Sequence, residues 1–189
     1  MLDVVTIAGS PSAPSRSAQV LELARARLEA EGLRCSSVVV RDLDPADLVY
    51  ARPDGPSVAE AIGLVQASRA VIIATPVYKA AYSGVLKAFL DLLPPGILAD
   101  KPVLPITTSG SLAHCLALDY ALKPVLSALG ARHVLAGVCV LDSQLGWRED
   151  GSVTLHPEVD ERLEAALAAL RAAIPAPSAI RSKQLKTIA

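Results

Sequence analysis

The sequence lacks any uninterrupted apolar run approaching the ~20 residues that a membrane-spanning helix needs, although 52% of its residues are hydrophobic. This excludes a membrane span. It also lacks a basic start followed by an apolar segment and a small-residue cleavage site, so we expect no export. The 189 residues suit one domain, which we place at 1–174. Residues 175–189, with Arg181, Lys183 and Lys186, are expected to form a flexible basic tail.

An excess of one charge and a pattern of paired cysteines are also missing. Eighteen lysines and arginines against 19 aspartates and glutamates give a net charge of -1, which supplies no field to gather nucleic acid or an anionic membrane. Cys35, Cys115 and Cys139 are odd in number and far apart. We therefore expect neither a disulfide framework nor a zinc pair, and predict small buried side chains in a reducing cytoplasm.

Motifs for metal binding and hydrolysis are absent as well. The three histidines, at 114, 133 and 156, have no ligand spacing, and neither H-E-x-x-H nor G-x-S-x-G occurs. We expect no metal ion and structural roles for the histidines. His114 is the one to watch, because it falls in the first turns of a helix that leaves the predicted ligand-binding edge.

What the sequence does contain is a regular alternation of short β-rich apolar runs with longer segments of helical period. This pattern favours a parallel sheet covered by helices on both faces. The predicted strands cover residues 3–8, 34–40, 70–75, 102–107 and 133–141. Five such units favour a doubly wound α/β sheet of order 2-1-3-4-5 over an eight-unit barrel. Ligands then bind beyond the carboxyl ends of the strands, between strands 1 and 3.

The helices are indicated by apolar residues at three- and four-residue intervals. The first helix has this spacing at Leu21, Ala24 and Leu28. The third should bury a stripe made of Tyr82, Leu86, Phe89, Leu90 and Leu93. A fourth helix is expected over 112–129 and a last one, rich in alanine, leucine and glutamate, over 157–173.

The loop after the first strand, residues 9–17, reads G-S-P-S-A-P-S-R-S and runs directly into the first helix. Serine hydroxyls, an arginine and the free amides of a helix start together suit a phosphate. Neither G-x-G-x-x-G nor the Lys-Ser/Thr of a triphosphate loop is present, which favours a phosphomonoester. The alternative is an ordinary serine cap with no ligand.

The segment after the third strand, residues 75–82, reads T-P-V-Y-K-A-A-Y. Pro76 and the small Ala80 would let this backbone lie flat against a planar ring such as an isoalloxazine. The alternative is that Tyr78 and Tyr82 only cover the end of the sheet, and for Tyr82 the helical stripe favours that reading.

The segment after the fourth strand, residues 107–111, offers hydroxyls and the flexible Gly110 beside the same edge, although alone it is only a turn signal. The helix that follows contains Pro124, whose ring crowds the carbonyl of Tyr120. A local π-turn around 117–121 would relieve this clash, and such bulges are frequent at functional sites. An ordinary proline kink is the alternative.

Together these segments resemble the NADPH-dependent FMN reductases of the flavodoxin-like superfamily, in particular those of alkanesulfonate monooxygenase two-component systems. The most specific stretches are A-G-S-P-S-A-P-S-R-S, A-T-P-V-Y-K-A-A-Y-S-G-V-L-K and A-L-D-Y-A-L-K-P-V-L-S-A-L. The resemblance implies a flavodoxin-like fold, hydride transfer from NADPH or NADH to FMN, and a homodimer or homotetramer. It also implies a flavin-dependent monooxygenase partner, for organosulfonate sulfur assimilation.

The resemblance also implies roles for individual residues. Residues matching the phosphate-binding positions of the family are Ser10, Ser15, Arg16 and Ser17. Those expected along and around the flavin ring are Pro76, Val77, Tyr78, Lys79, Ser109 and Gly110. Tyr120 matches a tyrosine that related reductases carry in an interfacial π-helix, where it would keep FMN exchangeable. Relatives commonly have an arginine where this chain has Ser12, so Arg16 or a neighbouring subunit would supply that charge.

Two other functions fit the same fold. A flavodoxin-like electron carrier would bind FMN without turning over a nicotinamide nucleotide, but such carriers gain from strong acidity when they dock, and this chain has a net charge of -1. A quinone or azo reductase with tightly held FMN is separated less well by sequence. The favoured function is an NAD(P)H-dependent FMN reductase.

Overall fold

The computed structural model describes residues 2–176, so the predicted basic tail lies outside the described residues from position 177 onward. Its main sheet has the order β2-β1-β3-β5, with β6 and β7 both beside β5, and these strands all run parallel. The predicted order 2-1-3-4-5 is therefore confirmed. The strands are β1 (Leu2–Ala8), β2 (Cys35–Val39), β3 (Ser68–Tyr78), β5 (Pro102–Ser109), β6 (His133–Val134) and β7 (Val138–Leu141).

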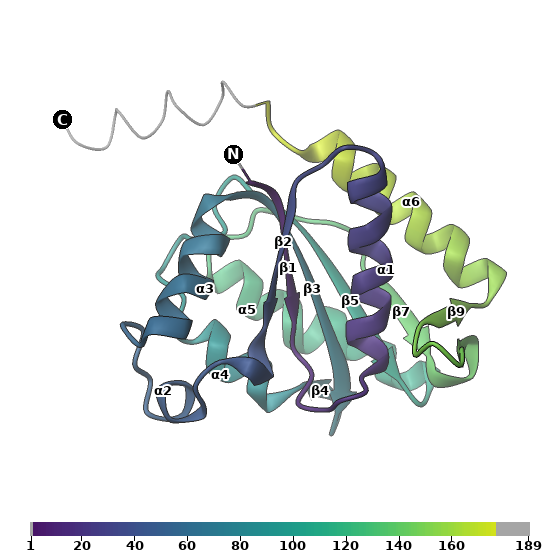
Figure 1. Ribbon diagram of the computed structural model, residues 1–189, viewed down its shortest axis with the longest axis horizontal. Coiled ribbons are helices and arrows are strands. Elements are labelled where there is room, and N and C mark those ends of the chain that lie inside the picture. The colour runs from purple at the N-terminus through teal and green to yellow at the C-terminus, as the bar shows by residue number, and fades with distance from the viewer. Residues whose placement is uncertain (1, 177–189) are drawn as a thin grey trace.

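Helices cover both faces of this sheet (Figure 1). On one face lie α1 (Arg16–Ala30) and α6 (Pro157–Ala173), and on the other α3 (Pro56–Ala67), α4 (Gly84–Leu90) and α5 (Lys123–Ala128). Successive strand residues point to opposite faces, so each strand feeds two separate cores. Val4 and Ile72 pack with α1 and α6, whereas Val5 and Ile73 pack with α3 and α4. The short η1 (Val40–Asp42) and α2 (Pro45–Val49) follow β2.

The predicted fifth strand is interrupted between β6 and β7. At this break a Cβ added to Gly137 would lie only 2.2 Å from the Cδ1 atom of Leu118. The missing side chain thus lets the helical segment after β5 pack directly against the interruption. After β7 and η4 (Asp142–Gln144) follows an antiparallel hairpin made of β8 (Leu145–Trp147) and β9 (Val153–Leu155). This hairpin was not predicted from the sequence.

The third predicted helix begins later than its apolar stripe indicated. Tyr82 belongs to a short strand, β4 (Ala81–Tyr82), which pairs antiparallel with the end of β3. The helix starts only at Gly84, because the Ser83 side chain caps it by accepting a hydrogen bond from the Leu86 amide at 3.2 Å. Placing Tyr82 in the helical stripe was therefore wrong, although its partly buried ring still packs against the same core.

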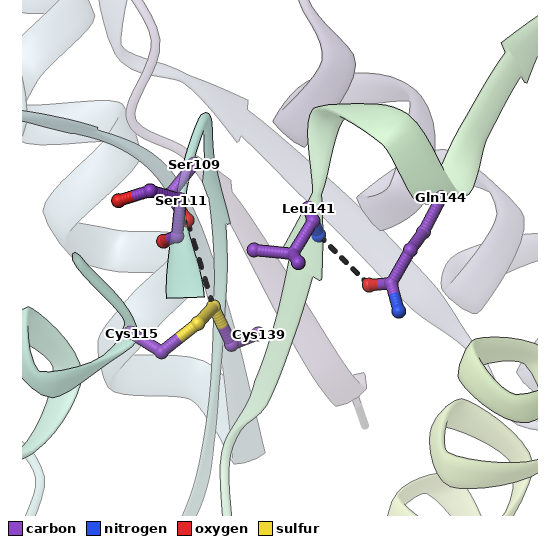
Figure 2. Close-up of a disulfide and its surroundings, with 6 residues drawn as sticks. All are labelled: Ser109, Ser111, Cys115, Cys139, Leu141 and Gln144. Atoms are coloured by element: carbon purple, nitrogen blue, oxygen red, sulfur yellow. Dashed lines mark hydrogen bonds between the residues drawn. A yellow bond between two sulfur atoms is a disulfide. The ribbon is translucent and has the colours of Figure 1, made fainter. Parts of the chain in front are cut away.

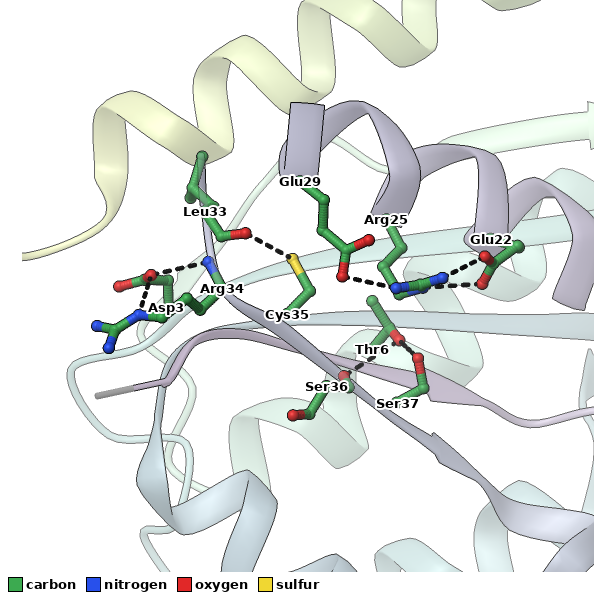
Figure 3. Close-up of polar contacts among 10 residues, drawn as sticks. All are labelled: Asp3, Thr6, Glu22, Arg25, Glu29, Leu33, Arg34, Cys35, Ser36 and Ser37. Carbon is green, nitrogen blue, oxygen red and sulfur yellow. Dashed lines mark hydrogen bonds and ion pairs between the residues drawn. The ribbon is translucent and has the colours of Figure 1, made fainter. Parts of the chain in front are cut away.

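A buried carboxylate ties together the amino ends of three strands. Asp3 accepts hydrogen bonds from the Arg34 amide at 2.9 Å and from Arg69 Nη1 at 2.6 Å (Figure 3 shows the Arg34 contacts). Arg69 in turn donates from Nε to the Pro175 carbonyl, just after α6. Burial alone would raise the pKa of Asp3, but these hydrogen bonds outweigh it and hold the pKa below its usual value.

We expect Asp3→Asn to lower the free energy of unfolding by about 1–3 kcal/mol at pH 7, because it leaves Arg69 without its carboxylate. Since folding lowers the pKa of Asp3, this stability is present above the unfolded pKa and is lost as the pH falls through the folded value. The difference between the two proteins in urea unfolding should therefore begin to shrink as the pH falls below about 4, the ordinary pKa of an aspartate, and should go on shrinking until the pH is below the lower folded value. Glu60→Gln, at an exposed α3 position, is the matched control. A difference that did not shrink between pH 7 and about pH 2 would contradict this account.

Candidate functional site

The loop after β1 and the start of α4 are held together by one serine. Ser83 Oγ donates to the Gly9 carbonyl, and the Ser83 amide donates to Thr75 Oγ1 at 3.0 Å. Gly9 is required for this approach, since a Cβ there would lie 2.7 Å from Leu86 Cβ. The ends of β1 and β3 are therefore fixed next to each other, at the point where the doubly wound topology places ligands.

The loop predicted to bind a phosphate, residues 9–17 (the phosphate loop), ends at the start of α1. Ser15 is the N-cap of α1, and its Oγ accepts from the Ala18 amide at 3.3 Å. Ser15 Oγ and Ser17 Oγ lie 3.2 Å apart, and both side chains are buried. One hydroxyl donates to the other, so the pair retains one O–H for an anion. The first amides of the helix, at Arg16 and Ser17, add donors that need no partner inside the helix.

Of the other predicted phosphate-binding residues, Ser10 is buried in the loop and Arg16 is half exposed. Ser10 Oγ accepts from the Ser12 amide at 3.2 Å. Arg16 Nε lies 3.6 Å from Asp142 Oδ1, and a Cβ on Gly110 would lie 3.9 Å from Asp142 Oδ2. Arg16 thus leans toward the segment 107–111 at the end of β5. The loop after β1 and this segment are therefore neighbours, as the topology requires.

The residues predicted to lie along a planar ring form a hairpin that sequence reasoning missed. β3 continues to Tyr78, with Val77 opposite Tyr82 and Tyr78 opposite Ala81. Lys79 and Ala80 make the two-residue turn, with φ values of 50° and 63°. Such turns usually carry asparagine or glycine, so Lys-Ala gives no signal. Pro76, Val77 and Tyr78 are therefore strand residues, not loop residues, although they remain at the ligand-binding edge.

At the end of β5, Ser109 is buried and Gly110 is exposed. Ser109 Oγ donates to the Ser111 carbonyl at 2.9 Å, which turns the chain back at the edge. Two residues earlier, Thr107 Oγ1 is buried and has no hydrogen-bond partner within residues 2–176. An unsatisfied buried hydroxyl beside the carboxyl ends suits a site that receives a polar ligand.

The expectation that the cysteines are unpaired is wrong for two of them. Cys115 and Cys139 form a disulfide with Cα atoms 5.7 Å apart (Figure 2). The two cysteines are 24 positions apart, so the sequence did not indicate the pair. Because β5 and β7 are neighbours, the segment after β5 that carries Cys115 returns beside Cys139 in β7. Ser109 Oγ lies 3.8 Å from Cys139 Sγ, at the same edge. Cys35 is free, and burial raises its pKa to about 11.

Cys115→Ser should lower the free energy of unfolding by about 3 kcal/mol, because the disulfide closes a loop of 24 residues. Urea unfolding with and without a dithiol reductant checks this. Reductant should shift the wild-type midpoint to that of Cys115→Ser and leave the variant itself unchanged. Cys35→Ser is the control and should behave like the wild type. A wild-type urea midpoint that stays the same with and without reductant would show that the disulfide adds no stability.

The helix predicted over 112–129 is built from three pieces. A 3-10 helix η2 (Leu112–Leu116) is followed by a π-helix η3 (Leu118–Leu122), in which the Lys123 amide bonds the Leu118 carbonyl, and then by α5. The π-turn predicted from Pro124 is confirmed. Tyr120 is 80% exposed on it, near the exposed Leu112 and Leu116. His114 is also exposed, on η2.

A cavity of about 940 Å3 lies at the opposite end of the sheet, where the strands begin. It is lined by Ser68, Pro102 and His133, which begin β3, β5 and β6. Lys101 also lines it, donating to the Gln66 carbonyl at 3.0 Å, and burial lowers its pKa to about 8. Doubly wound sheets bind ligands at the carboxyl ends of their strands, so we place the site there and not in this cavity.

Two residues of the site escaped sequence reasoning. Ser83 could have been found, because a serine before glycine and an apolar run is a helix N-cap signal. Arg41, which follows β2 and donates from Nη1 to the Ser12 carbonyl, could not have been found, since only the pairing of β1 with β2 brings it to the phosphate loop.

The strand order, the phosphate loop at the start of α1 and the neighbouring loops after β3 and β5 define a flavodoxin-like mononucleotide-binding protein. A family model described as NADPH-dependent FMN reductase matches residues 2–146. The chain belongs to this family, as its sequence motifs indicated.

Individual relatives agree. The chain is 47% identical over 172 residues to a Pseudomonas putida protein named FMN reductase (NADPH), covering 90% of this chain and 87% of that one. An Escherichia coli protein of the same name is 47% identical over 165 residues, with 87% and 85% covered. A solved structure of an NADH:FMN oxidoreductase, EMOB, superposes with a TM-score of 0.84 at 37% identity, covering 94% of this chain and 93% of that chain.

Proposed function

We propose that this protein, an NAD(P)H-dependent FMN reductase by its family, binds FMN at the carboxyl ends of β1 and β3 and releases reduced FMN to a partner enzyme. The observation that carries the proposal is the anion cradle at the topological switch point, where the Ser15 and Ser17 hydroxyls meet the amides that begin α1. Its membership of the NADPH-dependent FMN reductase family supports the same ligand. When bound, FMN supplies a ring that accepts a hydride from the reduced nicotinamide.

In this proposal the protein's own residues bind the FMN phosphate and orient the flavin ring. Ser10, Ser15, Arg16 and Ser17 would hold the phosphate, and the O–H that the buried serine pair retains would donate a hydrogen bond to it. The hairpin backbone at Pro76, Val77, Tyr78 and Lys79 lies along the ring, where rigid pairing with β4 fixes its position. Ser109 and Gly110 close the far side, held by the contact of Ser109 with the Ser111 carbonyl.

Assembly and partners are part of the same proposal. Exposed large apolar side chains gather along η2 and η3, at Leu112, Leu116 and Tyr120, and β4 packs beside this segment. Exposed apolar groups of this kind mark interfaces, so we propose a homodimer or homotetramer with Tyr120 at a subunit contact near the flavin. The partner is a flavin-dependent monooxygenase of organosulfonate sulfur assimilation, supported by the motif resemblance alone. The location is cytoplasmic, where the disulfide would be reducible.

Titration of FMN into the purified protein tests the binding step. We expect saturable binding, seen as quenching of flavin fluorescence, and a protein that is colourless when purified because FMN exchanges as a substrate. In the absence of oxygen, which would reoxidise the reduced flavin, NADPH should then bleach added FMN. Failure to bind FMN would overturn the proposal. A protein that purifies yellow and keeps its flavin through gel filtration would favour the quinone or azo reductase instead. One that binds FMN but never oxidises NADPH or NADH would be an electron carrier.

A further inference from the structure

Two arginines approach the phosphate loop from different sides. Arg16 leans toward Asp142, 3.6 Å away, with both side chains 45% exposed. Arg41 comes from η1, which follows β2, and its Nη1 donates a hydrogen bond to the carbonyl oxygen of Ser12. Arg41 and Ser12 are 29 residues apart in the sequence, and the parallel pairing of β1 with β2 brings them together.

This contact does more than join two loops. A carbonyl oxygen carries a negative partial charge, which repels an anion. The Arg41 guanidinium offsets the partial charge of the Ser12 carbonyl in the loop that is proposed to hold the phosphate. The amide of the same residue donates to Ser10 Oγ at 3.2 Å. Arg41 therefore contacts the carbonyl side of the same residue whose amide binds Ser10. Arg41, Ser10 and Ser12 line one small cavity of about 200 Å3 against α1.

The charge of Arg41 remains available to an anion. Its Nε lies 3.3 Å from Asp42 Oδ1, but the Asp42 side chain is 65% exposed, so water weakens this ion pair. A guanidinium has five N–H donors in a fixed fork, and the contacts with Ser12 and Asp42 engage two of them. A phosphate that reached Arg41 would not have to break a buried ion pair.

We propose that Arg41 is a positioning residue of the flavin phosphate site and supplies its positive charge, so that it sets the preference for FMN over riboflavin. This inference rests on the proposed function, because it assumes that the loop at 9–17 holds the phosphate of FMN. It goes beyond that function by assigning the discrimination between a phosphorylated and an unphosphorylated flavin to a residue outside the loop.

Dissociation constants of FMN and riboflavin, measured by flavin fluorescence at low and high salt, test the inference. Arg41→Gln should weaken FMN binding about tenfold or more, leave riboflavin within about twofold, and flatten the salt dependence for FMN. Arg41→Lys should recover part of the loss at low salt, because it keeps the charge without the fork. Arg132→Gln, which removes an exposed arginine at the opposite end of the sheet, is the charge-matched control.

Equal losses for FMN and riboflavin in Arg41→Gln would show that Arg41 only braces the loop, and FMN affinity within twofold of the wild type would show that it contributes nothing. Either result overturns the inference. If Arg41→Gln does not fold, Arg41→Met, which keeps a long side chain without its charge, decides: an unchanged ratio of FMN to riboflavin affinity in that variant overturns the inference. A wild type that does not bind FMN overturns the proposed function itself. Loss of FMN in Ser15→Ala/Ser17→Ala but not in Arg41→Gln overturns this inference alone.

Discussion

Replacing Ser15 and Ser17 together by alanine should raise the dissociation constant of FMN by about tenfold to a hundredfold. The two buried hydroxyls, 3.2 Å apart, retain one O–H for the phosphate, and a hydrogen bond to a charged group contributes roughly 1.5–3 kcal/mol. Riboflavin carries no phosphate, so its affinity should change by less than about threefold. Fluorescence titration with both flavins measures the difference.

The double substitution also removes the N-cap of α1, which costs about 1 kcal/mol of stability. Riboflavin is the internal control for that loss, because a damaged fold would weaken both ligands alike. Ser57→Ala, which removes a hydroxyl that accepts from the Asp44 amide, controls for serine substitution elsewhere. If circular dichroism shows that the variant keeps its fold, a loss of FMN affinity no larger than the loss of riboflavin affinity would place the phosphate outside this loop.

Deleting Tyr120 should change how the protein uses flavin. The π-helix Leu118–Leu122 contains one residue more than a regular helix would, so the deletion allows an unbroken i to i-4 pattern up to α5. The exposed aromatic side chain is lost at the same time; if Tyr120 is a hot spot of the proposed subunit contact, this truncation costs about 2 kcal/mol or more. We expect the variant to purify yellow and to reduce free FMN at least about tenfold more slowly.

Tyr120→Ala separates the two effects, because it removes the ring and keeps the length of the helix. If the π-turn itself keeps FMN exchangeable, this variant stays colourless whereas the deletion is yellow. If the ring at the interface is responsible, both variants purify yellow. A folded deletion variant that stays colourless and turns over FMN at the wild-type rate would show that the π-helix is incidental.

The strands and helices could be predicted because each has its own period of apolar residues, and the order of the sheet could be predicted because five alternating units fit a known doubly wound order. The π-helix could be predicted because Pro124 has a steric requirement that holds in any fold. The hairpin at Lys79 and Ala80 could not, since both residues adopt positive φ without the asparagine or glycine that normally signals it. Tyr82 was misplaced because its spacing to Leu86 fits a helix, whereas the cap at Ser83 ends that pattern.

For the site, the sequence could indicate the loops but not the contacts between them. The serines of the phosphate loop are contiguous and precede a helix, so their chemistry is visible in one stretch. Arg41 and the pair Cys115 and Cys139 depend on which strands become neighbours, and neither residue type nor spacing encodes that directly. The predicted strand order places β1 beside β2 and β5 beside β7, but the register of these pairs and the path of the turns after β2 and β5 had to be seen before these contacts could be assigned.

The most direct test of the central claim is anaerobic turnover, in which the protein is mixed with NADPH and an excess of free FMN and both absorbance bands are followed. The account predicts that each NADPH oxidised yields one reduced FMN over many turnovers per chain, and that riboflavin is a poorer substrate through a higher KM. Oxidation of neither NADPH nor NADH, with FMN bound at the loop after β1, would contradict it.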